Sequence, residues 1–149
     1  MPSFGTLAPD YYFSIPENDR QNRCDLTSDT CIVDDQFFFI RGCLEVPVMG
    51  TREKFSWGVW VSISKDNFLN LMDHYDDLDR TKIGPMFGWL SVTLEVYPEC
   101  ETLKTLVHIR PPDLRPLIEL QPTDHPLAIE QRDGISVDRL AEIYAVYGH

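Results

Sequence analysis

The stretch FFFIRGCLEVPVMGTREKFSWGVWVSIS, residues 37–64, predicts two β-strands joined by a tight turn. In its first half, apolar side chains occupy most even positions from Phe38 to Val48; in its second half, they occupy the odd positions from Phe55 to Ile63. Because successive side chains of a strand point to opposite faces, each half has one apolar face. We therefore expect an antiparallel hairpin that buries one face in the core.

The opposite face of this hairpin carries an unexpected indole. The second strand places small or hydroxyl-bearing residues on that face, with Trp60 as the exception. The neighbouring strands add further rings and polar groups, so we take one set as the candidate binding residues of the sheet face: Arg41, Trp60, Phe87, Trp89, His108 and Glu119. A face that is merely solvated carries few large rings. Aromatic side chains with a few polar groups are typical of small-ligand pockets and of protein-binding hot spots.

The rest of the chain predicts two helices and several more strands. Apolar residues at helical spacing from Phe68 to Tyr75 predict an amphipathic helix within residues 64–77, and a similar pattern follows Ser136 to the C-terminus. Strands are expected at residues 85–98, 103–112 and 115–122, with a short edge strand at 127–131. Short connections favour antiparallel pairing. We predict one α+β domain over residues 1–149, built on a mainly antiparallel sheet of about five to six strands with a mid-chain helix and a C-terminal helix.

Residues 1–35 are rich in turns, and we predict that they form an irregular covering segment. Two interpretations of the aromatic face follow from this segment. In the first, the aromatic residues 11–13 fold over the face as a second layer. In the second, the face stays open as a concavity for a ligand or a partner.

Composition restricts the class of partner. The chain has 149 residues, enough for one domain with a sizeable core, and a formal net charge of −11. Such a charge repels phosphate backbones and anionic lipid, so we expect no direct nucleic-acid or membrane partner, and it attracts basic proteins. No apolar run reaches the length of a membrane span, and no secretory signal precedes the four cysteines. We therefore expect a cytoplasmic protein with free thiols.

No motif predicts a reaction, a metal site or a cofactor. The sequence contains no CxxC, HxxxH, HExxH or GxGxxG pattern. Cys43, His108 and Glu119 could meet across strands, but no nucleophile elbow or oxyanion loop accompanies them. A histidine that is hydrogen-bonded within the sheet is the simpler interpretation, so no catalytic residue is assigned.

Carboxylates gather at the end of the mid-chain helix. We predict a binding acidic patch there, in which the negative charges oppose the helix dipole: Asp73, Asp76, Asp77 and Asp79. Such an arrangement does not stabilise the helix itself, whereas a cationic partner would bind to these carboxylates. Solvated surface acids are the alternative.

Several long segments in a fixed order resemble a bacterial family of small proteins, the domain-of-unknown-function family 2199. They include APDYYFSIP (8–16), the two strands of the 37–64 hairpin, LKTLVHIRP (103–111) and RPLIELQPTDHPLAIEQRDGI (115–135). Many members of that family begin with a short cysteine cluster that resembles a zinc knuckle. This chain has no such cluster ahead of Phe4, so no metal role is transferred. The resemblance implies a fold and a bacterial, intracellular setting, and it implies no catalytic residues.

These observations lead to three hypotheses. The first is a non-enzymatic, acidic, cytoplasmic protein-binding module; its most specific form is an immunity or antitoxin protein that neutralises a basic toxin domain. The second is a small-ligand-binding protein or enzyme that uses a pocket on the aromatic face. The third is a structural homodimer sealed through that face.

Overall fold

The hairpin expected from residues 37–64 forms the centre of the fold. In the computed structural model, which describes residues 3–148, β4 (Phe37–Pro47) pairs antiparallel with β5 (Lys54–Ile63) from Phe38↔Ile63 to Pro47↔Lys54. The apolar rows are buried as predicted, with Leu44 on β4 and Val59 on β5 fully excluded from solvent.

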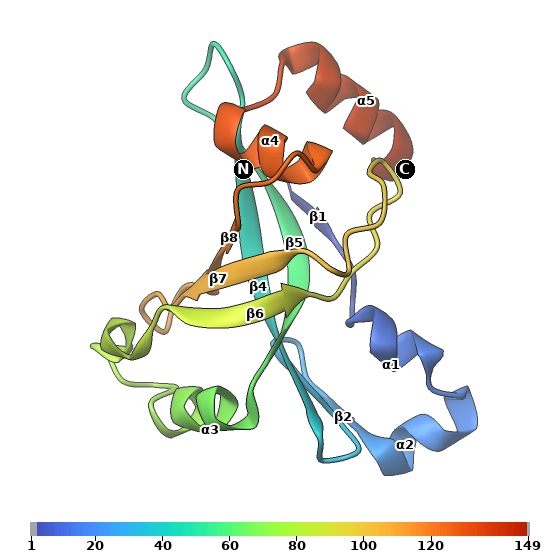
Figure 1. Ribbon diagram of the computed structural model, residues 1–149, viewed down its shortest axis with the longest axis vertical. Helices are drawn as coiled ribbons and strands as arrows, with labels where there is room; N and C mark the ends of the chain where they lie inside the picture. The colour runs from blue at the N-terminus through green and yellow to red at the C-terminus, as the bar shows by residue number, and fades with distance from the viewer. Residues whose placement is uncertain (1–2, 149) are drawn as a thin grey trace.

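The sheet then closes into a five-stranded barrel (Figure 1). β6 (Met86–Leu90), β7 (Lys104–His108) and β8 (Leu117–Leu120) follow β5 as successive antiparallel neighbours, and β8 returns to β4 through the parallel pair Cys43↔Leu117. The apolar rows therefore face one another across the barrel interior rather than a layer of helices. They fill it with fully buried side chains: Leu44, Val46, Val59, Val61, Leu90, Val107 and Ile118.

Helices lie at the ends of the barrel (Figure 1). α4 (Pro126–Asp133) and α5 (Val137–Tyr147) lie at the upper end in this view, and α3 (Lys65–Asp73) lies at the lower end, followed by the short η2 (Arg80–Ile83). The side chains of Ser64 and Ser136 accept hydrogen bonds from backbone amides and cap α3 and α5. Within residues 3–148, none of the helices has the length and apolar character that crossing a membrane requires.

The α+β single-domain prediction is confirmed, but within residues 3–148 the sheet has eight strands, because residues 3–35 are not irregular. Positions 1 and 2 of the predicted covering segment lie outside the described residues. β4 and β5 extend beyond the barrel, and the backbone edges exposed there are paired by N-terminal strands. β1 pairs in parallel with β5, while β3 pairs with β4 and β2 with β3. The segment contains β1 (Ser3–Gly5), α1 (Asp10–Ser14), η1 (Glu17–Asp19), α2 (Arg20–Arg23), β2 (Cys24–Leu26) and β3 (Thr30–Val33).

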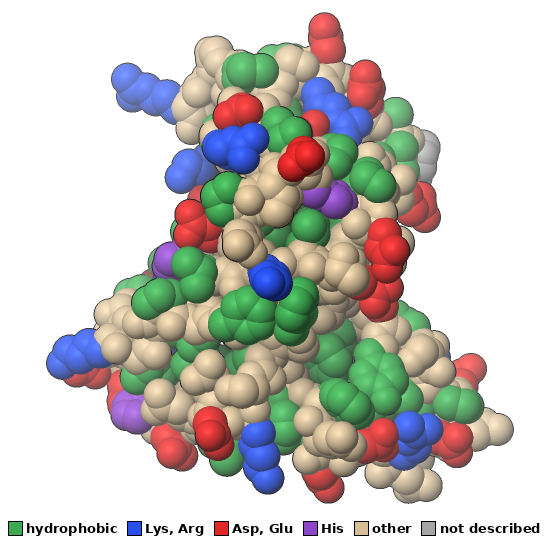
Figure 2. All heavy atoms as spheres, in the orientation of Figure 1, with side chains coloured by type: hydrophobic (Ala, Val, Ile, Leu, Met, Phe, Trp, Pro, Cys, Tyr) green, Lys and Arg blue, Asp and Glu red, His purple; other side chains and the backbone are tan. Residues whose placement is uncertain are grey.

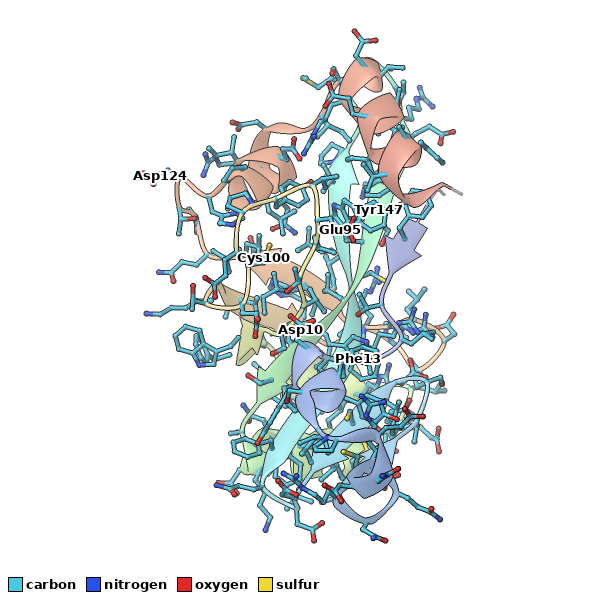
Figure 3. The ribbon with its side chains drawn as sticks, turned by 90° about the vertical axis from the view of Figure 1, so that its right-hand side faces the viewer. Asp10, Phe13, Glu95, Cys100, Asp124 and Tyr147 are labelled. Carbon is cyan, nitrogen blue, oxygen red and sulfur yellow. The ribbon has the colours of Figure 1, made fainter. Side chains whose placement is uncertain are left out.

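Two strand predictions in the second half of the chain are wrong. Residues 127–131 belong to α4, because Pro126 suits the first helical turn and the His125 ring accepts a hydrogen bond from the Leu127 amide. The strand expected at 85–98 ends at Leu90, and residues 91–98 leave the sheet. In that segment the Glu95 amide donates to the Tyr147 hydroxyl at 2.7 Å, so α5 takes the place of a neighbouring strand (Figure 3).

Candidate functional site

The six sheet-face residues all lie on the outward side of barrel strands, as the alternation predicts. Arg41 and Trp60 are register partners on β4 and β5, Phe87 and Trp89 lie on β6, and His108 and Glu119 lie on β7 and β8. Because the outside of a closed barrel is convex, side chains on strands that are not neighbours point away from one another. The structure therefore divides this set among separate places, and the single aromatic pocket expected for a small ligand is not formed by them.

Trp60 is covered by the N-terminal segment. Its side chain is 0% exposed, and its indole Nε1 donates to the Thr6 carbonyl oxygen at 3.1 Å. The Tyr11 ring of α1 lies 5.0 Å from the Phe37 ring, measured between centroids, and extends the cover along β4. The second-layer interpretation is therefore correct for this half of the face, and Trp60, which the sequence predicts as a binding residue, is not accessible to a partner in this arrangement.

The other half of the face is open. Phe87 and Trp89 on β6 and Leu106 on β7 are 46%, 41% and 44% exposed, and we call these three residues the β6–β7 aromatic patch. The Phe87 and Trp89 rings meet edge to face with centroids 5.3 Å apart, and Leu106 is the register partner of Phe87. Beside the patch is a hollow of about 430 Å³, walled partly by Leu120. Figure 2 shows apolar side chains gathered over β6 and β7 at the centre of the molecule.

His108 and Glu119 form an exposed pair, with 2.9 Å between Nε2 and Oε1. Cys43 and His108 are both register partners of Leu117, on opposite sides of β8. Two strand spacings separate them by about 10 Å, which is too far for direct proton transfer between thiol and imidazole. The arrangement supports the interpretation of His108 as a histidine hydrogen-bonded within the sheet.

Arg41 lines a second hollow, which lies over the outward face of β4 and has a volume of about 550 Å³. Three other arginines line it, and we call it the arginine hollow: Arg41, Arg80, Arg110 and Arg115. No pattern in the sequence singled out the last three as site residues. They come from η2 and from the loop between β7 and β8, and no local motif links those segments to β4.

Three of the four arginines are bound to the protein itself. Arg80 donates to four backbone carbonyls, Arg110 donates through Nε to the Arg115 carbonyl at 2.7 Å, and Arg115 donates through Nε to Asp29 at 2.7 Å. The Arg41 side chain has no acceptor among the described residues, and its Nε is buried. Burial, together with the nearby charge of Arg115, lowers the pKa of Arg41.

The acidic patch is exposed, but most of it lies beyond the helix. α3 ends at Asp73, so Asp76, Asp77 and Asp79 occupy the turns that follow rather than the last helical turn. The predicted opposition to the helix dipole therefore applies to Asp73 alone. Asp79 accepts a hydrogen bond from Lys82 at 2.8 Å, which lowers the pKa of its carboxyl group.

The cysteines are free thiols in the described chain. Burial raises the pKa of Cys31 to about 12 and that of Cys100 to about 11, so both remain protonated at neutral pH. Within residues 3–148, no three side chains of His, Cys, Asp or Glu are grouped so that they could hold a metal ion.

Comparison with known proteins identifies the family. The model of the family described as "Uncharacterized protein conserved in bacteria (DUF2199)" matches residues 1–135. This match spans most of the chain, so the chain belongs to that family. No curated protein and no solved structure matches it.

Proposed function

We propose that this DUF2199 protein is an acidic protein-binding module that docks a basic protein through the β6–β7 aromatic patch. One observation carries the proposal: the chain covers Trp60 with its own N-terminal segment and leaves Phe87, Trp89 and Leu106 open on paired strands. Strands hold these side chains in fixed positions, so a partner has little flexibility to remove when it binds.

The composition of the patch suits a protein interface. Aromatic side chains dominate the binding energy of many interfaces, and a single central ring often contributes 2 kcal/mol or more, on the order of a 30-fold change in affinity. The Lys104 ammonium lies 5.7 Å from the Trp89 ring centroid, and exposed Glu119 lines the adjacent hollow. An apolar centre with charged groups at its margin is the usual plan of such a surface.

Charge complementarity supports a basic partner. The chain carries 24 acidic and 13 basic residues, and the acidic patch is exposed shortly before the chain enters β6. A protein with this net charge attracts cationic surfaces over roughly a Debye length, about 8 Å at physiological salt, and speeds up their encounter. Association is therefore expected to weaken as salt concentration rises.

The narrower form of the proposal is an immunity or antitoxin protein of the bacterial cytoplasm that neutralises a basic toxin domain. Small size, acidity and the absence of a catalytic motif support it, and the four free cysteines fit a reducing compartment. Alternatively, the same patch could bind a second copy of this chain and form a homodimer, and the experiment below distinguishes a homodimer from a complex with a basic protein.

The test compares capture by three forms of the purified protein. Wild type, the double variant Phe87→Ser/Trp89→Ser and the control Leu78→Ser are immobilised and exposed to lysate of the source cell at low and at high salt. Leu78 is 86% exposed and lies outside the patch, so its change removes exposed apolar surface from another part of the molecule. We expect a basic protein to bind wild type and Leu78→Ser and to be lost from the double variant and at high salt. Purified partner should then bind the double variant at least about 100-fold more weakly.

Two outcomes contradict the proposal. One is a set of captured proteins that is the same for all three forms. The other is a wild type that light scattering shows to be a dimer while the double variant is a monomer, because the patch would then bind a second copy of the chain.

A further inference from the structure

The arginine hollow has a composition unlike the rest of this acidic chain. It contains four of the 13 basic residues and only three carboxylates, those of Asp29, Glu45 and Asp113. Its remaining walls include apolar side chains from α3 and from the β7–β8 loop, among them Leu71 and Leu114. The volume of about 550 Å³ lies within the range of small-molecule sites.

Among the residues that the structure describes, Arg41 is the one guanidinium in this hollow that has no acceptor. Its Nε is buried, and its Nη2 lies over Gly58, where a side chain would come within 3.5 Å of it. Burying a donor without a partner costs free energy, and a cationic donor costs more than a neutral one. Arg80, Arg110 and Arg115 avoid that cost through acceptors on the chain. The acceptor for Arg41 is therefore expected to come from outside the chain.

We infer that the arginine hollow binds a small organic anion, whose carboxylate or phosphate group accepts hydrogen bonds from Arg41 and whose body packs against the apolar walls. A guanidinium presents parallel N–H donors that match the oxygens of both groups. Arg115 lies on the same wall and adds a second positive charge, with its Nε held by Asp29.

The net charge of the chain does not prevent such binding. Exposed carboxylates farther than about 8–10 Å are largely screened at physiological salt, whereas a partly buried arginine acts on its ligand at short range. Two of the three carboxylates that line the hollow are already engaged: Asp29 accepts from Arg115, and Glu45 accepts from Lys54 and Arg110. The third, Asp113, is exposed to solvent.

The test uses benzoate and phenyl phosphate as probes, with benzamide as the uncharged analogue of benzoate. Heteronuclear NMR of the full chain follows the side-chain Nε–H signals of the arginines, and the Arg41 signal is identified by its loss in Arg41→Met. We expect one or both anions to shift the Arg41 signal to saturation and benzamide to leave it unchanged. The anion that binds more tightly identifies the ligand as a carboxylate or a phosphate.

Variants then test the role of Arg41. In Arg41→Met, followed through backbone amides of the hollow, the affinity for the anion should fall at least about tenfold, the loss of one charge-assisted pair. The same change at exposed Arg52 should have no effect. Arg41→Met should unfold at or above the wild-type midpoint, because it removes a buried donor that has no acceptor. If Arg41→Met does not fold, Arg41→Lys takes its place in the test, because lysine keeps the positive charge but lacks the parallel N–H donors of the guanidinium. The inference is overturned if no anion binds saturably, if benzamide binds equally well, or if both Arg41 variants keep the wild-type affinity. None of these results affects the docking proposal, which depends on Phe87 and Trp89.

Discussion

Replacing Arg80 with methionine is expected to lower the free energy of unfolding by about 3–5 kcal/mol. Arg80 is only 4% exposed, and its guanidinium is the shared donor for four backbone carbonyls. These belong to Tyr75, Arg110, Pro111 and Leu114, at distances of 2.6 to 3.3 Å. Methionine keeps much of the side-chain length but donates nothing, so it leaves buried acceptors unpaired.

Urea denaturation followed by tryptophan fluorescence measures this change. Arg52→Met removes the same charge from an exposed turn and should alter the free energy of unfolding by less than about 0.5 kcal/mol. Arg80→Lys keeps the charge but has a shorter reach, and it should fall between wild type and Arg80→Met. If Arg80→Met proves as stable as Arg52→Met, the carbonyl contacts contribute nothing to the fold.

The same substitution links stability to the arginine hollow. Arg80 joins the end of the α3 region to the loop that carries Arg110 and Arg115. Once those contacts are lost, the loop keeps its direct bonds to β4, through Cys43 and Glu45, but is no longer tied to the α3 region. The anion probes should therefore bind Arg80→Met more weakly even where it remains folded. Arg41→Met is expected to do the opposite for stability, which distinguishes a residue that holds the loop from one that binds a ligand.

The sequence predicted which side of each strand is apolar, but it did not predict what covers that side. Alternation placed Leu44 and Val59 on the core side, and the structure buries both. It could not reveal that β8 returns to β4, because closure depends on twist accumulated over five strands and on one parallel pair, Cys43↔Leu117. A flat sheet needs helices to cover its apolar face. A closed barrel buries that face in its own interior, so the helices pack at the two ends of the barrel.

Local signals of another kind were misjudged. The apolar run at 127–131 is short enough for a strand, yet Pro126 in the first turn and Gly134 after the last are typical of a helix. At 92–96 the alternation is real and Val92 and Leu94 are buried, but the backbone there bonds to α5 and to loops rather than to a strand. Alternating apolar residues indicate which side chains are buried, but buried side chains can also belong to a segment that is not hydrogen-bonded into a β-sheet.

The candidate site was also predicted only in part from the sequence. Phe87 and Trp89 were correctly placed on an outward face, and they remain open. Arg41 was correctly assigned to the face, but its neighbours are arginines from distant loops rather than Trp60 and His108. Pairings of that kind arise only when the chain has folded, because no spacing in the sequence relates residue 41 to residues 80, 110 and 115.

Replacing Trp60 with alanine is the second change for which we expect a large loss of stability, about 3–5 kcal/mol in the free energy of unfolding. The indole is fully buried between β5 and the N-terminal segment, and its Nε1–H donates to the Thr6 carbonyl. Its removal leaves a cavity and an unpaired carbonyl in the place where residues 6–13 cover the barrel. Limited proteolysis should therefore cut that segment faster in Trp60→Ala than in wild type.

A milder pair of variants isolates the hydrogen bond from the packing. Trp60→Phe and Trp57→Phe delete the same atoms from fully buried indoles, but the Trp57 Nε1–H makes only a weak contact with the Tyr97 hydroxyl, outside ordinary hydrogen-bond geometry. Trp60→Phe should therefore destabilise the protein by about 1 kcal/mol more than Trp57→Phe, as measured by urea denaturation. Equal losses would mean that the Thr6 contact adds nothing. If Trp60→Ala instead keeps wild-type stability and loses partner capture, then the N-terminal segment opens in solution and Trp60 belongs to the binding surface after all.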